Sequence, residues 1–218
     1  MKTKEFCFII CTNDIRKYEE CEAYIKRLLI PEGYSLDIIT IWEAESICSA
    51  YNAGMQASEA KYKIYMHQDV FIINPYFLYE LKERFERDSQ VGMIGMIGSK
   101  TVPLSGVMWD TDRYGSLYET HVHETVLLTN YEDCKDVEVA LIDGFMMATQ
   151  YDIRWREDLF DKWDYYDASQ SMEFRLAGHK VLVPWQKEPW CIHDCGYVSL
   201  KNYENERCKF VKEYLLSD

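Results

Sequence analysis

One stretch constrains the fold more than any other: an apolar segment, residues 61–75, that is interrupted by the polar triplet His67-Gln68-Asp69. The aromatic and aliphatic residues before the triplet are typical of a buried strand. Polar groups at such a place are costly unless they are solvated or bind something. In open α/β sheets, ligands bind beyond the carboxyl ends of the strands. We therefore predict that Asp69, with or without His67, faces a bound diphosphate through a divalent metal ion.

Strand-like and helix-like patterns alternate through the first 98 residues. The continuously apolar run Phe6–Cys11 is typical of a central parallel strand that is covered on both faces. Further strands are expected at Leu36–Trp42 and Val91–Ile97, and helices are expected between the strands. This alternation predicts an α/β fold with a mainly parallel central sheet flanked by helices.

The pattern changes after Gly98, where turn residues become frequent. A strand-like piece at His121–Leu128 suggests a small antiparallel flap, in which His121 and His123 share one face of an exposed strand edge. A helix is expected at Asp167–Ala177, and an irregular aromatic segment at Trp185–Gly196. There is no internal repeat, low-complexity tract or linker, so we predict a single domain over residues 1–218.

The balance of charge limits the partners of the chain. With 24 Lys and Arg against 37 Asp and Glu, the formal net charge is −13, which argues against a nucleic-acid surface and a polybasic membrane anchor. No transmembrane segment or signal peptide is expected. The 8 cysteines form no C-x-x-C pair, so reduced thiols in a cytoplasmic protein, with peripheral membrane association left open, are the simplest interpretation.

Several short motifs follow one another in a recognisable order along the chain. They are Cys11-Thr-Asn13, Ala50-Tyr-Asn-Ala-Gly54, His67-Gln-Asp-Val70, Gly95-Met-Ile-Gly98, Asp143-Gly-Phe-Met-Met-Ala148, Tyr166-Asp167 ahead of Phe174-Arg-Leu-Ala-Gly178, and His193. In this order they resemble the family 2 glycosyltransferases with a GT-A fold. More narrowly, they resemble the branch typified by the streptomycin-biosynthesis glycosyltransferase-like domain.

The resemblance implies a function and a division of the chain. Such an enzyme moves a sugar from a nucleotide-diphosphate donor, a UDP-sugar before others, to a hydroxyl of a sugar or glycoconjugate acceptor. Inversion at the anomeric carbon and a role in surface-glycan or glycoconjugate synthesis are part of the same expectation. The nucleotide-binding half would span about residues 1–98, the acceptor half about 99–196, and a C-terminal helix about 202–216.

The resemblance also implies a donor site and a metal site. Thr12, Asn13, Glu43 (with Glu45 as its alternative), Asn52 and Asp69 would hold the donor, and Asp69, His67 and His193 would hold the metal ion. His67 stands where the family commonly has the first Asp of an Asp-x-Asp motif. Imidazole is a poorer ligand for Mg²⁺ than for Mn²⁺, so either ion, and metal dependence itself, stays open.

For the acceptor side, the resemblance points to Asp167 as the base that deprotonates the attacking hydroxyl, before Asp161 or Asp164. An alternative is that Asp167 caps a helix in a capping box with Gln170. Asp143 and Gly144 would bind the acceptor. Candidates for stacking on sugar faces are Trp109, Trp163, Trp185 and Trp190, although most aromatic residues are expected in the core.

Other interpretations remain beside this one. His67 can be a satisfied strand-end histidine and Asp69 a turn residue, and Cys191, His193 and Cys195 suggest zinc but lack a fourth ligand. A catalytically silent nucleotide-sugar-binding or scaffold protein is favoured by the missing first carboxylate. A nucleotidyltransferase ranks last, because no Gly-rich loop follows the first strand.

Overall fold

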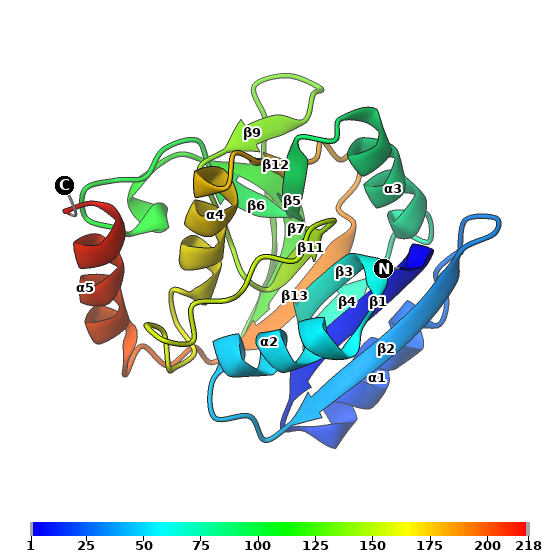
Figure 1. Cartoon of the computed structure of the whole chain (residues 1–218), viewed down its shortest axis with the longest axis horizontal. Coiled ribbons are helices and arrows are strands. Elements are labelled where there is room, and N and C mark those ends of the chain that lie inside the picture. The colour runs from blue at the N-terminus through cyan, green and yellow to red at the C-terminus, as the bar shows by residue number, and fades with distance from the viewer. Residues whose placement is uncertain (1, 217–218) are drawn as a thin grey trace.

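The first half of the chain follows the predicted alternation of strands and helices (Figure 1). The computed structural model describes residues 2–216. Strands β1 (Lys2–Thr12), β2 (Ser35–Trp42) and β3 (Ala60–His67) are parallel neighbours, with β1 in the middle. Helices α1 (Ile15–Ile25) and α2 (Ile47–Ala57) connect them. Their carboxyl ends therefore share one edge, where the first polar residues after each strand meet.

The main sheet has seven strands in the order β2-β1-β3-β11-β5-β12-β9. The additional strands are β5 (Val91–Gly95), β9 (Val137–Val139), β11 (Met146–Thr149) and β12 (Lys180–Val183). Strand β11 runs antiparallel to both β3 and β5, and β9 runs antiparallel to β12. The predicted mainly parallel α/β sheet is thus present, with two reversed strands.

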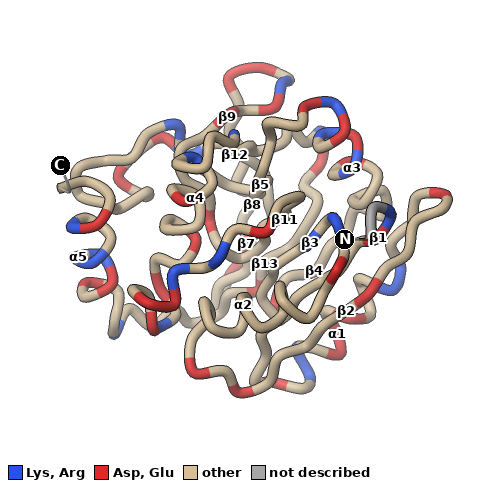
Figure 2. Tube along the Cα trace, in the orientation of Figure 1, with Lys and Arg blue, Asp and Glu red and all other residues tan. Residues whose placement is uncertain are grey.

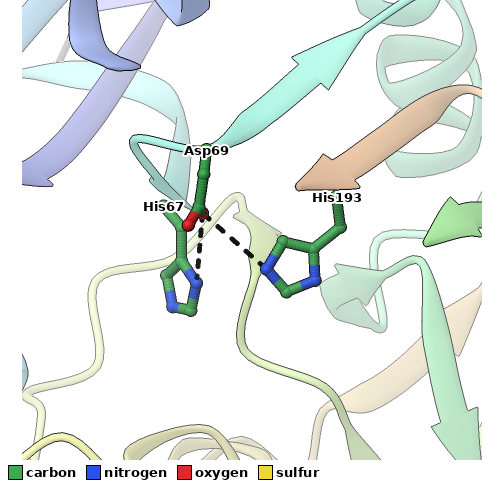
Figure 3. Close-up of side chains that lie close together, drawn as sticks. All are labelled: His67, Asp69 and His193. Carbon is green, nitrogen blue, oxygen red and sulfur yellow. Dashed lines mark ion pairs between the residues drawn. The ribbon is translucent and has the colours of Figure 1, made fainter. Parts of the chain in front are cut away.

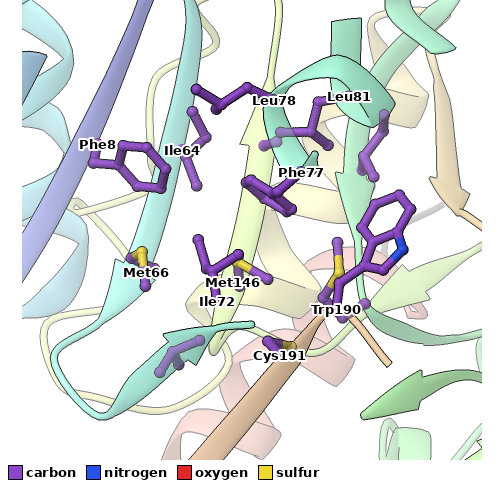
Figure 4. Close-up of a cluster of buried hydrophobic side chains, with 14 of the residues drawn as sticks. Phe8, Ile64, Met66, Ile72, Phe77, Leu78, Leu81, Met146, Trp190 and Cys191 are labelled. Atoms are coloured by element: carbon purple, nitrogen blue, oxygen red, sulfur yellow. The ribbon is translucent and has the colours of Figure 1, made fainter. Parts of the chain in front are cut away.

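Both faces of this sheet are buried. Along β1, Phe6 and Phe8 pack into one core cluster, whereas Cys7 and Ile9 pack into the other, as the two-residue period of a strand requires. Helices α2 and α4 (Tyr166–Leu176) lie in front of the sheet in Figure 1, and α1 lies behind β2. The first cluster also contains the apolar face of α3 (Phe77–Arg87), which lies over Phe8 and its neighbours (Figure 4).

A second sheet lies beside the first and contains the predicted flap. Its order is β10-β6-β7-β13-β4, with β8 paired to β7. The strands are β4 (Val70–Ile72), β6 (Ile97–Ser99), β7 (Arg113–His121), β8 (Thr125–Asn130), β10 (Leu141–Ile142) and β13 (Cys191–Gly196). Strand β13 connects the edge strand β4 to β7, because it pairs with β7 on one side and β4 on the other.

Two sequence-based assignments in this region are wrong. The segment predicted to be irregular contains β13, whose polar residues His193, Asp194 and Cys195 hide its strand character because part of the strand lines a cavity rather than a core. The predicted strand at His121–Leu128 is instead the turn of the β7–β8 hairpin plus part of β8. His123 lies in that turn, so it does not share a strand face with His121.

The N-terminal ends of α1 and α4 show a third difference between the sequence-based predictions and the structure. Asp14 caps α1, since its carboxylate accepts from the N–H groups of Arg16 and Lys17. The capping box proposed for Asp167 is absent. Helix α4 begins at Tyr166, and its N-cap residue is Tyr165, held in the left-handed region with φ 61°. Asp167 therefore lies inside the first helical turn.

The remaining helices are the short 3₁₀ helix η1 (Met108–Asp110) and α5 (Tyr203–Tyr214), which packs beside α4 at the left of Figure 1. Lys and Arg positions are scattered among the more numerous Asp and Glu positions (Figure 2). Within residues 2–216, no helix combines the length and the apolar character needed to cross a membrane.

Candidate functional site

The side chain of Gln68 joins the carboxyl ends of β1 and β3. Its Oε1 accepts hydrogen bonds from the Thr12 hydroxyl, from the Asn13 N–H at 3.0 Å and from the Asp14 N–H at 2.9 Å. Its Nε2 donates to Asn13 Oδ1 at 2.8 Å. The loop after β1 is therefore fixed against the end of β3 before any ligand binds. Sequence reasoning placed Gln68 in a motif but gave it no role.

A cavity of about 280 Å³ lies against this loop and contains most of the predicted donor residues. Thr12, Asn13 and Glu43 line it together with His67 and Asp69. Glu43 has φ 50°, an uncommon backbone conformation for a residue other than glycine, and its N–H donates to the Thr12 carbonyl at 3.2 Å. Strain of this kind clusters at functional sites, where the surroundings hold the residue in place. We call this space the donor cavity.

The three predicted metal ligands, His67, Asp69 and His193, lie close together, and the first two line the donor cavity (Figure 3). Asp69 Oδ1 lies 3.9 Å from His67 Nδ1 and 3.7 Å from His193 Nε2. Strand β13 carries His193 to this point through its pairing with β4. Asp69 Oδ1 is buried and has no hydrogen-bond partner among the described residues. A buried carboxylate oxygen without a donor, facing two imidazoles, is an arrangement that a cation would satisfy.

Both imidazoles are held neutral and in fixed orientations. Burial lowers the pKa of His67, and burial together with the neighbouring His67 lowers the pKa of His193 to about 3. His67 Nε2 lies 2.6 Å from the Tyr166 hydroxyl, and the His193 ring stacks on Phe145 at 4.7 Å. When Nε2 of His67 carries the proton, it donates a hydrogen bond to the Tyr166 hydroxyl. The Nδ1 atom of the same ring then presents a lone pair toward Asp69.

The ligand atoms of His67, Asp69 and His193 fit a divalent metal ion. Two neutral imidazoles and one carboxylate suit Mn²⁺ better than Mg²⁺, which prefers oxygen ligands alone. The positively charged side chain of Lys17, which the sequence analysis did not single out, also lies here. Its Nζ lies 3.4 Å from Asp69 Oδ2 and 3.5 Å from the Asp194 carbonyl. Because Lys17 follows the helix cap by three residues, its position at the sheet edge is a consequence of α1 starting at Ile15.

A larger cavity of about 390 Å³ opens on the other side of the same three residues. It shares His67, Asp69 and Trp163 with the donor cavity, so the two spaces meet at the metal-binding cluster. We call it the acceptor cavity. Its acidic lining residues are Asp69, Glu119, Asp143, Asp164 and Asp167. Its aromatic lining residues are Trp109, Trp163, Tyr165, Tyr166, Tyr197 and Tyr203. The other two tryptophans that were candidates for stacking on a sugar lie elsewhere: Trp185 lines a separate surface cavity, and Trp190 is a core residue.

Two of these carboxyl groups titrate far above their ordinary range. Burial, with the neighbouring Asp167, raises the pKa of Asp143 to about 7. Burial raises the pKa of Asp167 to about 6, against the opposing effect of the Ala168 and Gly144 N–H groups. By contrast, Lys209 and Lys162 lower the pKa of the exposed Asp161 to about 2. A general base works best with a pKa near the working pH, so Asp167 and Asp143 have the required property and Asp161 does not.

Two predicted site residues have other roles in the structure. Asn52 is buried, where its Nδ2 donates to the Trp155 carbonyl and its Oδ1 accepts from the Trp155 N–H, both at 2.9 Å. Its amide is thus committed to the core rather than turned to the donor cavity. A Cβ at Gly144 would lie 2.3 Å from the Tyr166 hydroxyl, so this glycine makes room for Tyr166, and its predicted contact with an acceptor stays a prediction.

Tyr166 is the most consequential residue that sequence reasoning missed. It fills the space over Gly144, and its hydroxyl orients His67.

The zinc interpretation of the Cys-x-His-x-Cys motif fails because Cys191 points into the apolar core beside Trp190 (Figure 4). Among the described residues, no potential metal-binding group includes Cys191.

Comparison with known proteins gives a family and a fold. The sequence profile of a family described as "Glycosyltransferase like family" matches residues 7–214. A search of curated protein sequences finds no significant match. Among solved structures, S. aureus TarS 1-349 in complex with UDP is similar with a TM-score of 0.59 and 12% identity, over 93% of this chain and 63% of that one.

Two further structures are similar to the same extent. PcManGT, a mannosyltransferase from Pyrobaculum calidifontis in complex with GDP-Man and Mn²⁺, has a TM-score of 0.58 and 11% identity, over 96% of this chain and 61% of that one. GalNAc-T7 with UDP, GalNAc and Mn²⁺ has a TM-score of 0.60 and 11% identity, over 94% and 48%. The chain thus spans less than two thirds of each protein, and these matches confirm the predicted GT-A fold.

Proposed function

The chain belongs to the glycosyltransferase-like family, and on that premise we propose that it transfers a sugar from a nucleotide-diphosphate donor to an acceptor hydroxyl. One observation carries the proposal: the donor cavity and the acceptor cavity meet at His67 and Asp69. A diphosphate at this junction would have its nucleoside on one side and its sugar on the other. The sugar would then face the carboxyl groups whose pKa values are raised.

The donor cavity supports the binding of a nucleotide. Thr12, Asn13 and Glu43 offer hydroxyl, amide and carboxylate groups of the kind that bind ribose and a nucleobase. TarS 1-349 was solved with UDP and PcManGT with GDP-Man, so donors of both kinds bind to proteins of this fold. We propose a UDP-sugar as the donor, with Lys17 near its phosphates.

His67, Asp69 and His193 would hold a divalent ion at the diphosphate, and Mn²⁺ fits their ligand atoms better than Mg²⁺. Such an ion stabilises the negative charge that builds up on a leaving diphosphate. The contribution of the chain itself is to keep both imidazoles neutral and oriented. Burial keeps both rings neutral, while Tyr166 orients His67 and Phe145 orients His193.

For the chemical step we propose inversion by direct displacement. The acceptor oxygen attacks the anomeric carbon, the bond to the diphosphate oxygen breaks, and the hydroxyl proton passes to Asp167. Its raised pKa allows Asp167 to be ionised at neutral pH and yet to hold a proton better than an exposed aspartate does. Asp143 would accept a hydrogen bond from the acceptor.

The narrower resemblance to the streptomycin-biosynthesis branch, a role in surface-glycan or glycoconjugate synthesis, and a cytoplasmic or membrane-peripheral location stay predictions. So does the organisation of residues 1–218 as one domain with a nucleotide half and an acceptor half.

The first experiment is a thermal-shift screen of UDP-, GDP-, CMP- and dTDP-sugars, each with and without Mn²⁺. A ligand that binds only the folded state raises the melting temperature. We expect one nucleotide class to stabilise the protein in the presence of Mn²⁺, and this effect to be lost in Asp69→Asn. The matched control is Asp194→Asn, because Asp194 lies close by and lines neither cavity.

The possible outcomes separate the alternatives. Stabilisation without Mn²⁺ would keep the donor site and remove His67, Asp69 and His193 as metal ligands. Donor binding without turnover, in the presence of a broad set of acceptors, would favour the catalytically silent binding protein. No response to any donor at millimolar concentration would overturn the transferase proposal.

A further inference from the structure

A second group of potential ligands lies on the wall of the acceptor cavity. Glu119 and His121 are two residues apart on β7, and Cys195 lies on the parallel neighbour β13. Residues two apart on a strand point to the same face. The ligand atoms of all three lie within 4.8 Å of one another. The pairing of β7 with β13 therefore creates a compact group of one carboxylate, one imidazole and one thiol.

The distances within this group match those around a bound metal ion. Cys195 Sγ lies 3.4 Å from His121 Nδ1, close to the ~3.5 Å that separates sulfur and nitrogen ligands of one tetrahedral Zn²⁺, given bonds of about 2.3 and 2.0 Å. Glu119 Oε2 lies 3.1 Å from Nε2 of the same ring. Carboxylates commonly hold the second nitrogen of a histidine that binds a metal.

The charge around the group supplies an independent argument. Five carboxylates line the acceptor cavity, and no Lys or Arg is among its lining residues. Burial without a cation already keeps the pKa of Asp143 and Asp167 high. A divalent ion on the cavity wall would provide the positive charge that the side chains lack.

We propose that Glu119, His121 and Cys195 form a second metal site, specific for a thiophilic transition-metal ion and for Zn²⁺ in the first place. Cys195 and His121 are its primary ligands, and Glu119 either completes the set or orients His121. The remaining coordination position faces the acceptor cavity, because Glu119 and Cys195 both line it. Thiolate binding distinguishes this site from the His67–Asp69–His193 cluster, which has only nitrogen and oxygen ligands.

The same three residues also resemble a nucleophilic thiol with a histidine base, but the details do not favour that alternative. The Cys195 thiol donates to the Thr120 carbonyl at 3.3 Å. The cavity that Cys195 lines has five carboxylates and no Lys or Arg among its lining residues. A reactive cysteine needs the opposite environment, in which positive charge stabilises the thiolate.

The test is a Co²⁺ titration followed by near-ultraviolet absorption, in which only cysteine ligands give a thiolate-to-metal charge-transfer band. Exposed thiols are removed first by Cys134→Ser and Cys208→Ser, and this double variant is the reference. We expect Co²⁺ to produce the band, which saturates within two equivalents because the His67–Asp69–His193 cluster also binds this ion, and we expect Zn²⁺ to abolish the band. Cys195→Ser and His121→Ala should each remove the band and weaken Zn²⁺ binding at least ~100-fold, beyond the ~10–100-fold effect of losing an outer partner.

His121 is exposed, so His121→Ala tests the site without disturbing the core. His67→Ala removes a ligand of the other cluster and should leave the band unchanged. A reference protein without the band, a band that survives Cys195→Ser, or a band that disappears in His67→Ala would each overturn the proposal. No donor or acceptor is used, so the result is independent of whether the transferase proposal holds.

Discussion

The two cavities that meet at Asp69 are built in different ways. The donor cavity lies at the ends of β1, β2 and β3, which are parallel neighbours connected by short segments of the chain. The acceptor cavity takes its walls from β7, β10, β13 and α4, which are far apart in the sequence. The first is a local product of strand order, and the second depends on the packing of the whole fold.

Their polar groups differ in the same way. At the donor edge, Gln68 and Asp14 have their hydrogen bonds satisfied by backbone groups and by Asn13. In the acceptor cavity, Asp143 and Asp167 are half-buried and each accepts one backbone N–H bond, but no Lys or Arg lines the cavity, and their pKa values are raised. Satisfied groups give a rigid binding surface, whereas perturbed carboxyl groups are poised for proton transfer. Under the proposed function, this difference assigns donor binding to one cavity and the chemical step to the other.

The strongest test of this division is Asp167→Asn, which removes the proposed base and leaves the donor cavity intact. We expect kcat to fall ~10²–10⁴-fold while donor affinity stays the same. In the wild type, kcat/KM should rise as the pH is raised through about 6, because the base must be deprotonated. In the variant that rise should be absent. Steady-state kinetics from pH 5 to 8 measure both effects.

The control for this experiment is Asp161→Asn. Asp161 was a competing candidate for the base, but its paired lysines keep it ionised and its pKa low. Activity within ~3-fold of the wild type is expected, as for a surface substitution of small effect. Loss of donor binding in Asp167→Asn would show that the two cavities are not separate in function.

A second prediction concerns Asn52, which the family resemblance assigns to the donor and the structure assigns to the core. Asn52→Ala leaves the N–H and carbonyl of Trp155 buried without partners. The free energy of unfolding should fall by ~3 kcal/mol, since each orphaned group costs ~1–3 kcal/mol. Chemical denaturation measures the loss. Donor affinity, measured well below the melting temperature, should not change, and a large loss there would return Asn52 to the donor site.

The third prediction uses the raised pKa of Asp143. A carboxyl group with a pKa near 7 in the folded state and 3.8 unfolded stabilises the protein at low pH, and that contribution is lost as the pH rises from about 4 to 7. Asp143→Asn imitates the protonated form at every pH. We expect the variant to be more stable than the wild type by up to ~4 kcal/mol at pH 8, because each pKa unit between the folded and unfolded states corresponds to ~1.4 kcal/mol, and equal to it at pH 4. Equal stability at both pH values would mean that the carboxylate is solvated.

The comparison also separates what the sequence predicts from what it does not. Strand ends and the polar triplet are local signals, and they locate the donor cavity and the Asp69 cluster. The bond between His67 and Tyr166 joins residues 99 apart in the chain, and that between Asn52 and Trp155 joins residues 103 apart. No spacing rule relates such pairs.

Strand β13 is the clearest case of a missed element. Its residues are polar where the strand borders the acceptor cavity, so its alternation is not that of a strand over a core. Only its pairing with β4 and β7 identifies it as a strand and carries His193 to Asp69. Sequence reasoning predicted the role of His193 from the family resemblance and not from the geometry that places it there.

The smallest expected effect comes from Gln68→Ala, which tests whether the donor edge is organised before the donor arrives. Gln68 binds the loop after β1 through one side-chain acceptor and one donor. Without these bonds, part of the donor's binding energy would be used to order the loop, so Kd should rise ~10-fold, equivalent to ~1.4 kcal/mol. Isothermal titration with the donor identified in the thermal-shift screen measures this change. Gln56→Ala, an exposed glutamine of α2, is the control and should leave Kd unchanged. An unchanged Kd in Gln68→Ala would mean that other contacts hold the loop, and the donor edge would then owe its rigidity to the strands alone.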